Sequence, residues 1–504
     1  MSKKKSVFLS FNIFYFLILF TPIAISMFYP IELETRESTL WLHVLTLKNG
    51  ISLYDQNLVA YANHAHGPID PLFKYVISSF FSFLEPWQVS RISNFLFFIF
   101  IYILFFCILK KFKFNLNIIL FLSSLFFSLI LLFTKGYQGR ADATALFFFL
   151  ILIFGVINYS NSNFFIYLLN PILSSLIIMT NWRFTHIVLV VSTFIFFKKF
   201  MENLEFRKIE YKSFIIYFFI FLVFPTIFLY FEFNLDISKY NDYFFNFFYF
   251  KSHFDLNFLL NGFQSLFKVE KFFVLIILCF LILHFVITRE FEVRKKFFFL
   301  LVFFTIFIIT LFQYLYNYTG GGIYYFTPII LITFFLFFVS LRDFNFYQNL
   351  ISNFYLKNIL ILLILLIVVS AAKFSISSSY YMIKTLPKAI EMHNYLVKFD
   401  NTGALSESLH FHKKKYSNEK IDIGDLLSYR SRQVGGDYLK TYQSHINDIK
   451  MNHFTYIIHN FAGSSEISSL IKKKIYVILK KFDESYFHSN LREVLVLKKN
   501  ILSK

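Results

Sequence analysis

The first apolar run of the chain reads VFLSFNIFYFLILFTPIAISMF (Val7–Phe28) and contains no charged residue. A helix needs about 20 mainly apolar residues to cross the hydrocarbon core of a bilayer. Comparable runs recur as far as about residue 376, and 57% of the 504 residues are hydrophobic while only 16% are charged. This composition excludes an ordinary soluble enzyme and predicts an α-helical multi-pass membrane protein.

Eleven apolar runs of helical length are the candidate spans of a membrane domain over residues 1–376. They lie at about 7–29, 91–109, 114–134, 143–158, 164–180, 184–197, 213–231, 272–288, 297–315, 322–341 and 358–376. The lysines before the first run also resemble the start of a signal peptide. The run is long and has no A-x-A-like site before Tyr29, so an uncleaved first helix is expected.

Charged residues return in the roughly 130 residues after the last run, which predicts a second, water-facing domain over residues 377–504. Helical patterns near 386–399 and 438–452 lie among strand-like runs in this tail. The strand-like runs are 455–461, 475–480 and 494–498. We therefore expect a small C-terminal α/β domain.

The meaning of the net charge of +19 depends on where the basic residues lie. With the N-terminus inside and the loops alternating, the cytoplasmic segments hold 17 Lys/Arg against 6 Asp/Glu, and the outer loops before the tail hold 10 against 12. This is the positive-inside distribution, which indicates membrane lipids and no nucleic acid as partners. An odd number of spans puts the tail outside, and the loss of one span would reverse its side.

Few residues are arranged in a pattern that holds a metal or forms a disulfide. The two cysteines, Cys107 and Cys279, both fall inside apolar runs, which supports neither a disulfide framework nor a cysteine metal site. His410 and His412 share a face of an expected strand, but no third ligand is apparent nearby, so they are interpreted as structural or solvated. The sequence indicates no definite cofactor and leaves a divalent cation open.

The first outer loop, about residues 30–90, is the longest loop before the tail, and long ordered loops are usually functional. Apolar residues between Leu40 and Leu47 predict a helix that is too short to span and lies along the membrane. Residues 71–84 predict a second interfacial helix, which begins with a proline.

Acidic residues stand where the outer ends of two spans are expected. Glu32, Glu34 and Glu37 follow the first span, where a carboxylate is partly desolvated and suited to accept a proton. Alternatively, each of them lies at the membrane–water interface without a catalytic role. The second outer turn, TKGYQGRADATALFFF (134–149), places Arg140 and Asp142 at the mouth of the fourth span.

These motifs, taken in order, resemble the GT-C superfamily of integral membrane glycosyltransferases, which includes protein O-mannosyltransferases and the lipid A aminoarabinose transferase. The order is acidic residues after span one, a G-x-x-x-Y step, a HGP element before interfacial helices, and R-x-D at span four. In this chain the motifs are Glu34 and Glu37, Gly50 to Tyr54, His66-Gly67-Pro68, and Arg140 with Asp142. GGGIYYFTPIILITFF (320–335) is similar to the family's late Tyr-x-x-Pro span opening, and the segments at 421–442 and 453–461 resemble the closing domain of bacterial members.

The resemblance implies transfer of a sugar from a polyprenyl-phosphate carrier to a glycan, lipid or protein acceptor, with an acidic residue of the first outer loop as general base. Two alignments place the family's acidic residue differently in this chain. The family spacing counted back from Gly50 places it at Glu37, whereas a match to an acidic-Thr-Arg string places it at Glu34. Glu34 is favoured, with Glu37 as the alternative one helical turn away. Neither has the family's second acid beside it. Asp142 matches the acid of the second outer loop.

The leaving group of such a transfer is a phosphate, whose growing negative charge needs cations or N–H donors. The outer face offers Arg140, Lys74, Arg91, Arg183, His64 and His66. We expect Arg140, Arg183, His66 and Lys74 to bind the donor phosphate, and favour the arginines because a guanidinium grips phosphate through two parallel bonds. Arg183 has an alternative role as an interfacial anchor beside Trp182. Without a clearly placed second carboxylate, the reaction is expected to invert the anomeric centre.

Two other classes of protein fit parts of the sequence. A transporter or flippase of lipid-linked sugars would usually carry charges at the membrane midplane, whereas these charges lie at the outer mouths. A non-catalytic envelope scaffold would leave the outer acids dispensable. Since the tail resembles bacterial members, the expected location is the bacterial inner membrane, with a cytoplasmic N-terminus and an extracytoplasmic C-terminal domain.

Overall fold

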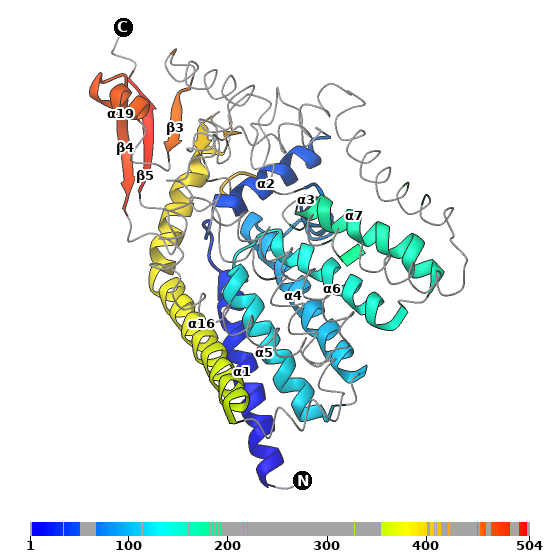
Figure 1. Ribbon diagram of the computed structural model, residues 1–504. Helices are drawn as coiled ribbons and strands as arrows, with labels where there is room; N and C mark the ends of the chain where they lie inside the picture. The colour runs from blue at the N-terminus through cyan, green and yellow to red at the C-terminus, as the bar shows by residue number, and fades with distance from the viewer. Residues whose placement is uncertain are drawn as a thin grey trace, which may run out of the picture.

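The computed structural model of the protein has a bundle of apolar helices and, at the end away from the N-terminus, a small β-sheet (Figure 1). The structure describes residues 3–33, 35–50, 67–111, 114–159, 162–181, 184, 188, 191–192, 215, 219, 327, 354–400, 404–407, 409, 411–414, 422–423, 451, 454–459, 465–483 and 493–500. The N-terminus lies at the foot of the bundle, and the C-terminus lies beyond the sheet.

Four helices in the described part of the chain are long and apolar enough to cross a membrane. They are α1 (Lys3–Ser26), α4 (Pro86–Lys111), α5 (Leu116–Thr134) and α16 (Phe354–Leu396). The runs predicted at 7–29, 91–109, 114–134 and 358–376 are thereby confirmed as helices of spanning length.

Two shorter apolar helices follow at the runs predicted for 143–158 and 164–180. They are α6 (Asp142–Tyr159) and α7 (Asn170–Thr180), and a π-helical turn at Phe165–Leu169 precedes α7. The five runs from 184–197 to 322–341 lie outside the described residues, apart from isolated positions.

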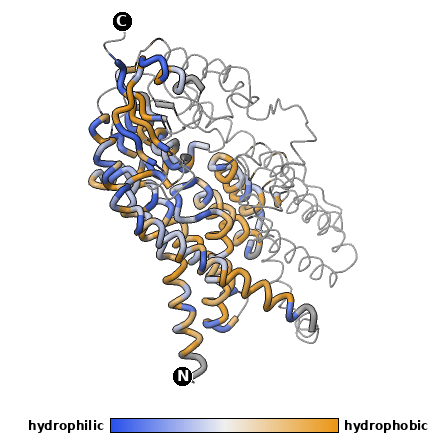
Figure 2. Tube along the Cα trace, turned by 90° about the vertical axis from the view of Figure 1, so that its left-hand side faces the viewer, coloured by the Kyte–Doolittle hydropathy of each residue, from blue (hydrophilic) through white to orange (hydrophobic). Residues whose placement is uncertain are grey.

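α16 is a single helix of 43 residues, although the sequence predicted a span and a separate tail helix. At a rise of 1.5 Å per residue it is about 64 Å long, roughly twice the thickness of a bilayer core. It therefore passes without interruption through the expected domain boundary at residue 376. The serines and lysines beyond that point end the apolar pattern, but a helix tolerates them. In Figure 2 hydrophobic residues predominate in the lower bundle, and hydrophilic ones are frequent near the sheet.

Aromatic packing and side-chain hydrogen bonds join the spans. Phe20 of α1 stacks on Phe127 of α5 with ring centroids 4.5 Å apart, and the Tyr15 hydroxyl lies 2.6 Å from Ser128 Oγ. α5 is buried along most of its length. Because lipid tails are as apolar as phenylalanine, close packing and interhelical hydrogen bonds hold such helices together.

The chain after α16, called the C-terminal domain below, contains in its described part a mixed five-stranded sheet in the order β2-β1-β3-β5-β4. The strands are β1 (Leu405–Glu407), β2 (Asp422–Ile423), β3 (Tyr456–His459), β4 (Tyr476–Phe482) and β5 (Val494–Lys499), and α19 (Ser465–Lys472) precedes β4. β1 pairs in parallel with β2 and β3, whereas β5 runs antiparallel to β3 and β4. The three predicted strands are confirmed as β3, β4 and β5. The short strands β1 and β2 were missed, and the helix predicted at 438–452 lies outside the described residues apart from Met451.

α2 (Thr35–Lys48) is the first helix of the outer loop, and protein covers its apolar side chains. Leu40, Trp41, Leu42, Val44 and Leu45 are each at most 2% exposed. They pack with Val89 of α4 and Phe411 of the C-terminal domain. The expectation that this apolar face lies against the membrane is therefore wrong, because a short apolar stripe alone does not distinguish lipid from a covering domain.

α3 (Ile69–Phe80) is the second helix of the outer loop, and its polarity is inverted. Its polar side chains Asp70, Lys74 and Ser78 are buried in the protein, whereas Phe73 and Phe80 are 38% and 79% exposed. An exposed apolar face with an inward polar face suits an interfacial position, as the sequence predicted for residues 71–84. The same helix points its charges into the bundle.

Candidate functional site

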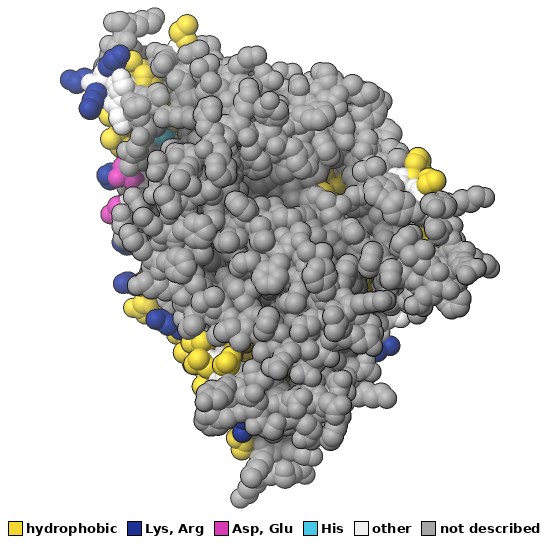
Figure 3. All heavy atoms as spheres, viewed as in Figure 1, with side chains coloured by type: hydrophobic (Ala, Val, Ile, Leu, Met, Phe, Trp, Pro, Cys, Tyr) yellow, Lys and Arg dark blue, Asp and Glu magenta, His cyan; other side chains and the backbone are white. Residues whose placement is uncertain are grey.

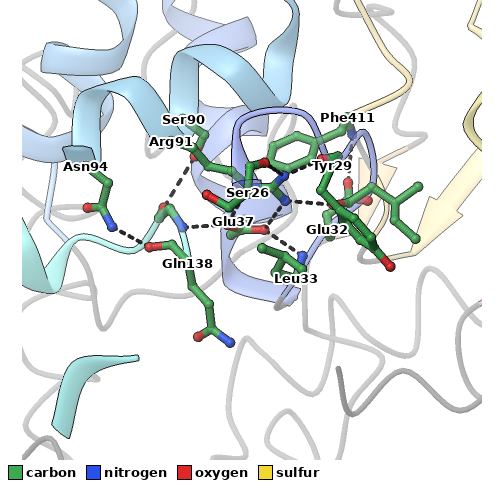
Figure 4. A network of polar contacts seen from close by, with 12 residues as sticks. Ser26, Tyr29, Glu32, Leu33, Glu37, Ser90, Arg91, Asn94, Gln138 and Phe411 are labelled. Atoms are coloured by element: carbon green, nitrogen blue, oxygen red, sulfur yellow. Dashed lines mark hydrogen bonds and ion pairs between the residues drawn. The ribbon is translucent and has the colours of Figure 1, made fainter. Parts of the chain in front are cut away.

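Three stretches that are far apart in the sequence meet at the end of the bundle that lies away from the N-terminus (Figure 4). They are the first turn of α2 with Glu37, the first turns of α4 with Arg91, and the turn 135–141 between α5 and α6. α3 and the end of α7 complete the cluster. The charged side chains in it are buried: Glu37, Asp70, Lys74, Arg91, Arg140 and Asp142 are each at most 6% exposed.

The Glu37 carboxylate is bonded on both oxygens. Oε1 accepts hydrogen bonds from Arg91 Nε at 3.2 Å and from the Gly139 N–H. Oε2 accepts from Arg91 Nη2 at 3.0 Å and from the Leu33 N–H at 2.7 Å. A carboxylate has about four acceptor positions, and these donors occupy them. Glu37 therefore ties the first outer loop to α4 and to the second outer turn.

Arg91 uses the rest of its guanidinium to hold the exit of α1. Nη1 donates to the carbonyls of Ser26, at 2.5 Å, and Tyr29, and Nη2 donates to the carbonyl of Ile31 at 2.7 Å. Carbonyls at the end of a helix lack partners within the helix, so a planar fork of N–H donors suits this place. Together with Glu37, Arg91 fixes the path of residues 26–37.

A second buried ion pair lies on α3. Lys74 Nζ is 2.5 Å from Asp70 Oδ2 and donates to the Gly139 carbonyl at 2.8 Å. The other Asp70 oxygen, Oδ1, accepts from Thr144 Oγ1 of α6 at 2.8 Å. α3 is thus tied to the second outer turn and to the helix that follows it.

Gly139 joins the two ion pairs, since Glu37 binds its N–H and Lys74 binds its carbonyl. Ser90 Oγ also donates to that carbonyl, at 3.3 Å. A Cβ at this position would overlap the Ser90 side chain and lie 3.2 Å from Glu37 Oε1. Only glycine lets the turn approach both partners this closely.

Arg140 and Asp142 follow this glycine directly. Arg140 Nε lies 2.9 Å from Asp142 Oδ2, and Asn181 Nδ2 donates to Asp142 Oδ1 at 2.9 Å. Asp142 is the first residue of α6, where the helix dipole favours a negative charge. Asn181 follows the last residue of α7, so the second and third outer turns meet at this carboxylate.

The HGP element brings the start of α3 against the end of α7. The Gly67 N–H donates to the Thr180 carbonyl at 3.0 Å, and a Cβ on Gly67 would overlap the Met179 carbonyl. The glycine of this element therefore serves a close approach between two backbones.

The predicted site residues fall into two groups. The structure brings Glu37, Lys74, Arg91, Arg140 and Asp142 into one cluster. The others lie outside the described residues: Glu34, His64, His66 and Arg183.

The sequence analysis missed three residues of the cluster: Asp70, Thr144 and Asn181. Asp70 had a local signal, because it lies four residues before Lys74 on a helix, where opposite charges face each other. Thr144 and Asn181 had none, since their partners are 74 and 39 residues away in the chain.

The arrangement presents three carboxylates and three cations in a buried cluster at one end of the bundle. Such a cluster can hold a loop in a fixed geometry and can offer charge to a phosphate or a proton acceptor to a hydroxyl group. Within the described ranges, no group of three His, Cys, Asp or Glu side chains is placed to hold a metal ion.

Among known proteins, similarity to this chain is found in solved structures. No protein-family model and no curated protein matches the chain. The crystal structure of ArnT from Cupriavidus metallidurans bound to undecaprenyl phosphate is similar, with a TM-score of 0.52 and 10% identity over 99% of this chain and 98% of that one. The apo state of the same protein matches with a TM-score of 0.49 and 10% identity, over 96% and 97% of the two chains. The chain therefore has a fold similar to that of ArnT, in agreement with the resemblance found in the sequence.

Proposed function

We propose that this protein is a glycosyltransferase that moves a sugar from a polyprenyl-phosphate donor to an acceptor at the outer face of a bacterial inner membrane. The observation that carries the proposal is the buried charged cluster at the outer mouth of a bundle with the ArnT fold. The related crystal structure holds undecaprenyl phosphate, which supports a carrier of this class.

In this proposal Glu34 is the general base. It directly precedes α2, whose first turn Glu37 and Arg91 hold in place. Glu37 was the other candidate for the base, but four donors occupy its oxygens, so we assign it to fixing the loop. Asp142 would orient the acceptor or Arg140.

The donor phosphate would be met by Arg140, Lys74, Arg183 and His66. Lys74 gives two of its three N–H groups to Asp70 and Gly139, which leaves one for a phosphate oxygen. Attack by the acceptor hydroxyl on the anomeric carbon would break the bond to phosphate and invert that centre, while the base takes the hydroxyl proton.

The test is transfer by the purified protein from a panel of radiolabelled polyprenyl-phosphate sugars to membrane acceptors. Glu34→Gln and Asp142→Asn are each expected to reduce turnover about a hundredfold or more with the fold intact. Glu37→Gln is expected to lower thermal stability as well as turnover. A parallel assay of lipid movement tests the transporter alternative. Full turnover in Glu34→Gln would contradict the assignment of the base, and lipid movement without transfer would contradict the enzyme.

A further inference from the structure

A short segment of the C-terminal domain, residues 411–414, contacts the charged cluster through Phe411, which Figure 4 shows beside Arg91 and Glu32. We infer that this segment, here called the tail segment, holds the first outer loop in its working position, with Phe411 and Glu32 as positioning residues. The inference extends the proposed function, because it assigns part of the site's geometry to the extracytoplasmic domain.

Phe411 makes two contacts with the cluster. Its N–H donates to Glu32 Oε1 at 2.7 Å, and its ring centroid lies 5.5 Å from the Arg91 guanidinium carbon. Phe411 is 1% exposed and Glu32 is 3% exposed, so both contacts are shielded from water. The ring covers the same guanidinium that binds Glu37, and attraction between a cation and an aromatic face is stronger when water is excluded.

The tail segment also contacts α2 through a hydrogen bond and apolar packing. Trp41 Nε1 donates to the Lys413 carbonyl at 3.0 Å, and Phe411 packs in the same apolar cluster as Trp41 and Val89. α2 is therefore enclosed between α4 and the C-terminal domain.

Three consecutive residues immediately before Glu34 are each fixed by a different partner. Arg91 binds the Ile31 carbonyl, the tail segment binds the Glu32 carboxylate, and Glu37 binds the Leu33 N–H. Arg91 belongs to α4 and Glu37 to α2, whereas the third partner belongs to a domain some 380 residues further along the chain. A misplacement of about 1 Å in a catalytic group can cost about a hundredfold in rate, so release of one of the three is expected to slow the reaction.

A surface contact of the same segment supplies a matched control. Lys414 Nζ lies 2.9 Å from Glu85 Oε1, but the two side chains are 56% and 32% exposed. An exposed pair of this kind contributes little to stability, so Lys414→Ala changes the tail segment without loosening the cluster.

The experiment compares Glu32→Ala, Glu32→Gln, Phe411→Leu and Lys414→Ala in the full-length protein. Glu32→Ala and Phe411→Leu are expected to lower kcat about tenfold to a hundredfold with the donor KM within about threefold, since neither residue touches substrate. Glu32→Gln retains the oxygen that accepts the Phe411 N–H and is expected to restore most of kcat. Lys414→Ala is expected to stay within about twofold of the parent chain.

Hydrogen exchange without substrate gives a second readout that does not need turnover. In Glu32→Ala and Phe411→Leu the amides of residues 29–37 are expected to exchange faster, while those of α5 are unchanged. Unchanged exchange in residues 29–37, or a rise in donor KM with kcat preserved, would overturn the inference. If the parent chain shows no transfer but exchange responds as expected, the proposed enzyme fails and the coupling between the domains stands.

Discussion

Two regions of the molecule carry ion pairs of similar length in opposite surroundings. In the outer cluster, Arg91 and Glu37 lie 3.0 Å apart with side chains at most 1% exposed. Beside the sheet, Lys480 and Glu391 lie 3.3 Å apart with side chains 39% and 54% exposed. Figure 3 shows basic side chains, Lys or Arg, on the surface at this end of the molecule. The comparison teaches that burial, more than distance, decides what the loss of one partner costs.

The largest effect is expected from Arg91→Met. The change leaves the Glu37 carboxylate and three carbonyls without the guanidinium, and breaking a buried pair costs about 3–5 kcal/mol of unfolding free energy. Unfolding by SDS in mixed micelles measures this loss. Arg91→Lys keeps the charge without the planar fork of donors, so its unfolding free energy should fall between that of Arg91→Met and that of the parent chain. A loss of unfolding free energy below about 1 kcal/mol for Arg91→Met would contradict the contrast between the buried and the exposed ion pair.

The second effect concerns the pair on α3. Lys74→Met leaves the buried Asp70 with Thr144 as its remaining side-chain partner among the described residues, and we expect a loss of about 3 kcal/mol. The double change Lys74→Met with Asp70→Leu should lose less than the sum of the single changes, because both charges leave together. Additive losses in the same unfolding assay would show that the two residues do not interact.

An intermediate effect is expected at the glycine that joins the two pairs. In Gly139→Ala the new Cβ overlaps the Ser90 side chain, and overpacking of this kind costs about 1–3 kcal/mol. Adding Ser90→Gly removes the obstructing side chain and should recover part of the stability. Thermal unfolding in detergent compares the two variants, and equal melting temperatures for Gly139→Ala and the parent chain would count against the close approach.

The smallest effect is expected at the surface of the sheet. Lys480→Ala removes an exposed partner of Glu391 and should change the unfolding free energy by no more than about 0.5 kcal/mol, because solvent screens the pair. The change should shrink further as salt is added. A loss comparable to that of Lys74→Met would remove the distinction between the two regions.

Several features of the fold were predictable because they depend on local pattern. A long run without charges such as Val7–Phe28 has to be a helix in a membrane. Short apolar runs typical of strands predicted β3, β4 and β5. The placement of Arg140 and Asp142 at a helix mouth also followed from sequence, since the apolar residues of α6 begin directly after them. The short strands β1 and β2 carry too few residues for a pattern to show.

The sequence by itself determined that the chain is a membrane protein, where its first spans lie, and that charged groups gather at the ends of some of these spans. Only the tertiary structure decided which charges pair: Glu37 with Arg91, 54 residues apart, and the Phe411 N–H with Glu32, 379 residues apart. It also decided that α2 faces a protein domain. The physical reason is that the preference of a side chain for water or for lipid is a property of that residue alone. An ion pair depends instead on how the packing of distant helices brings two side chains together.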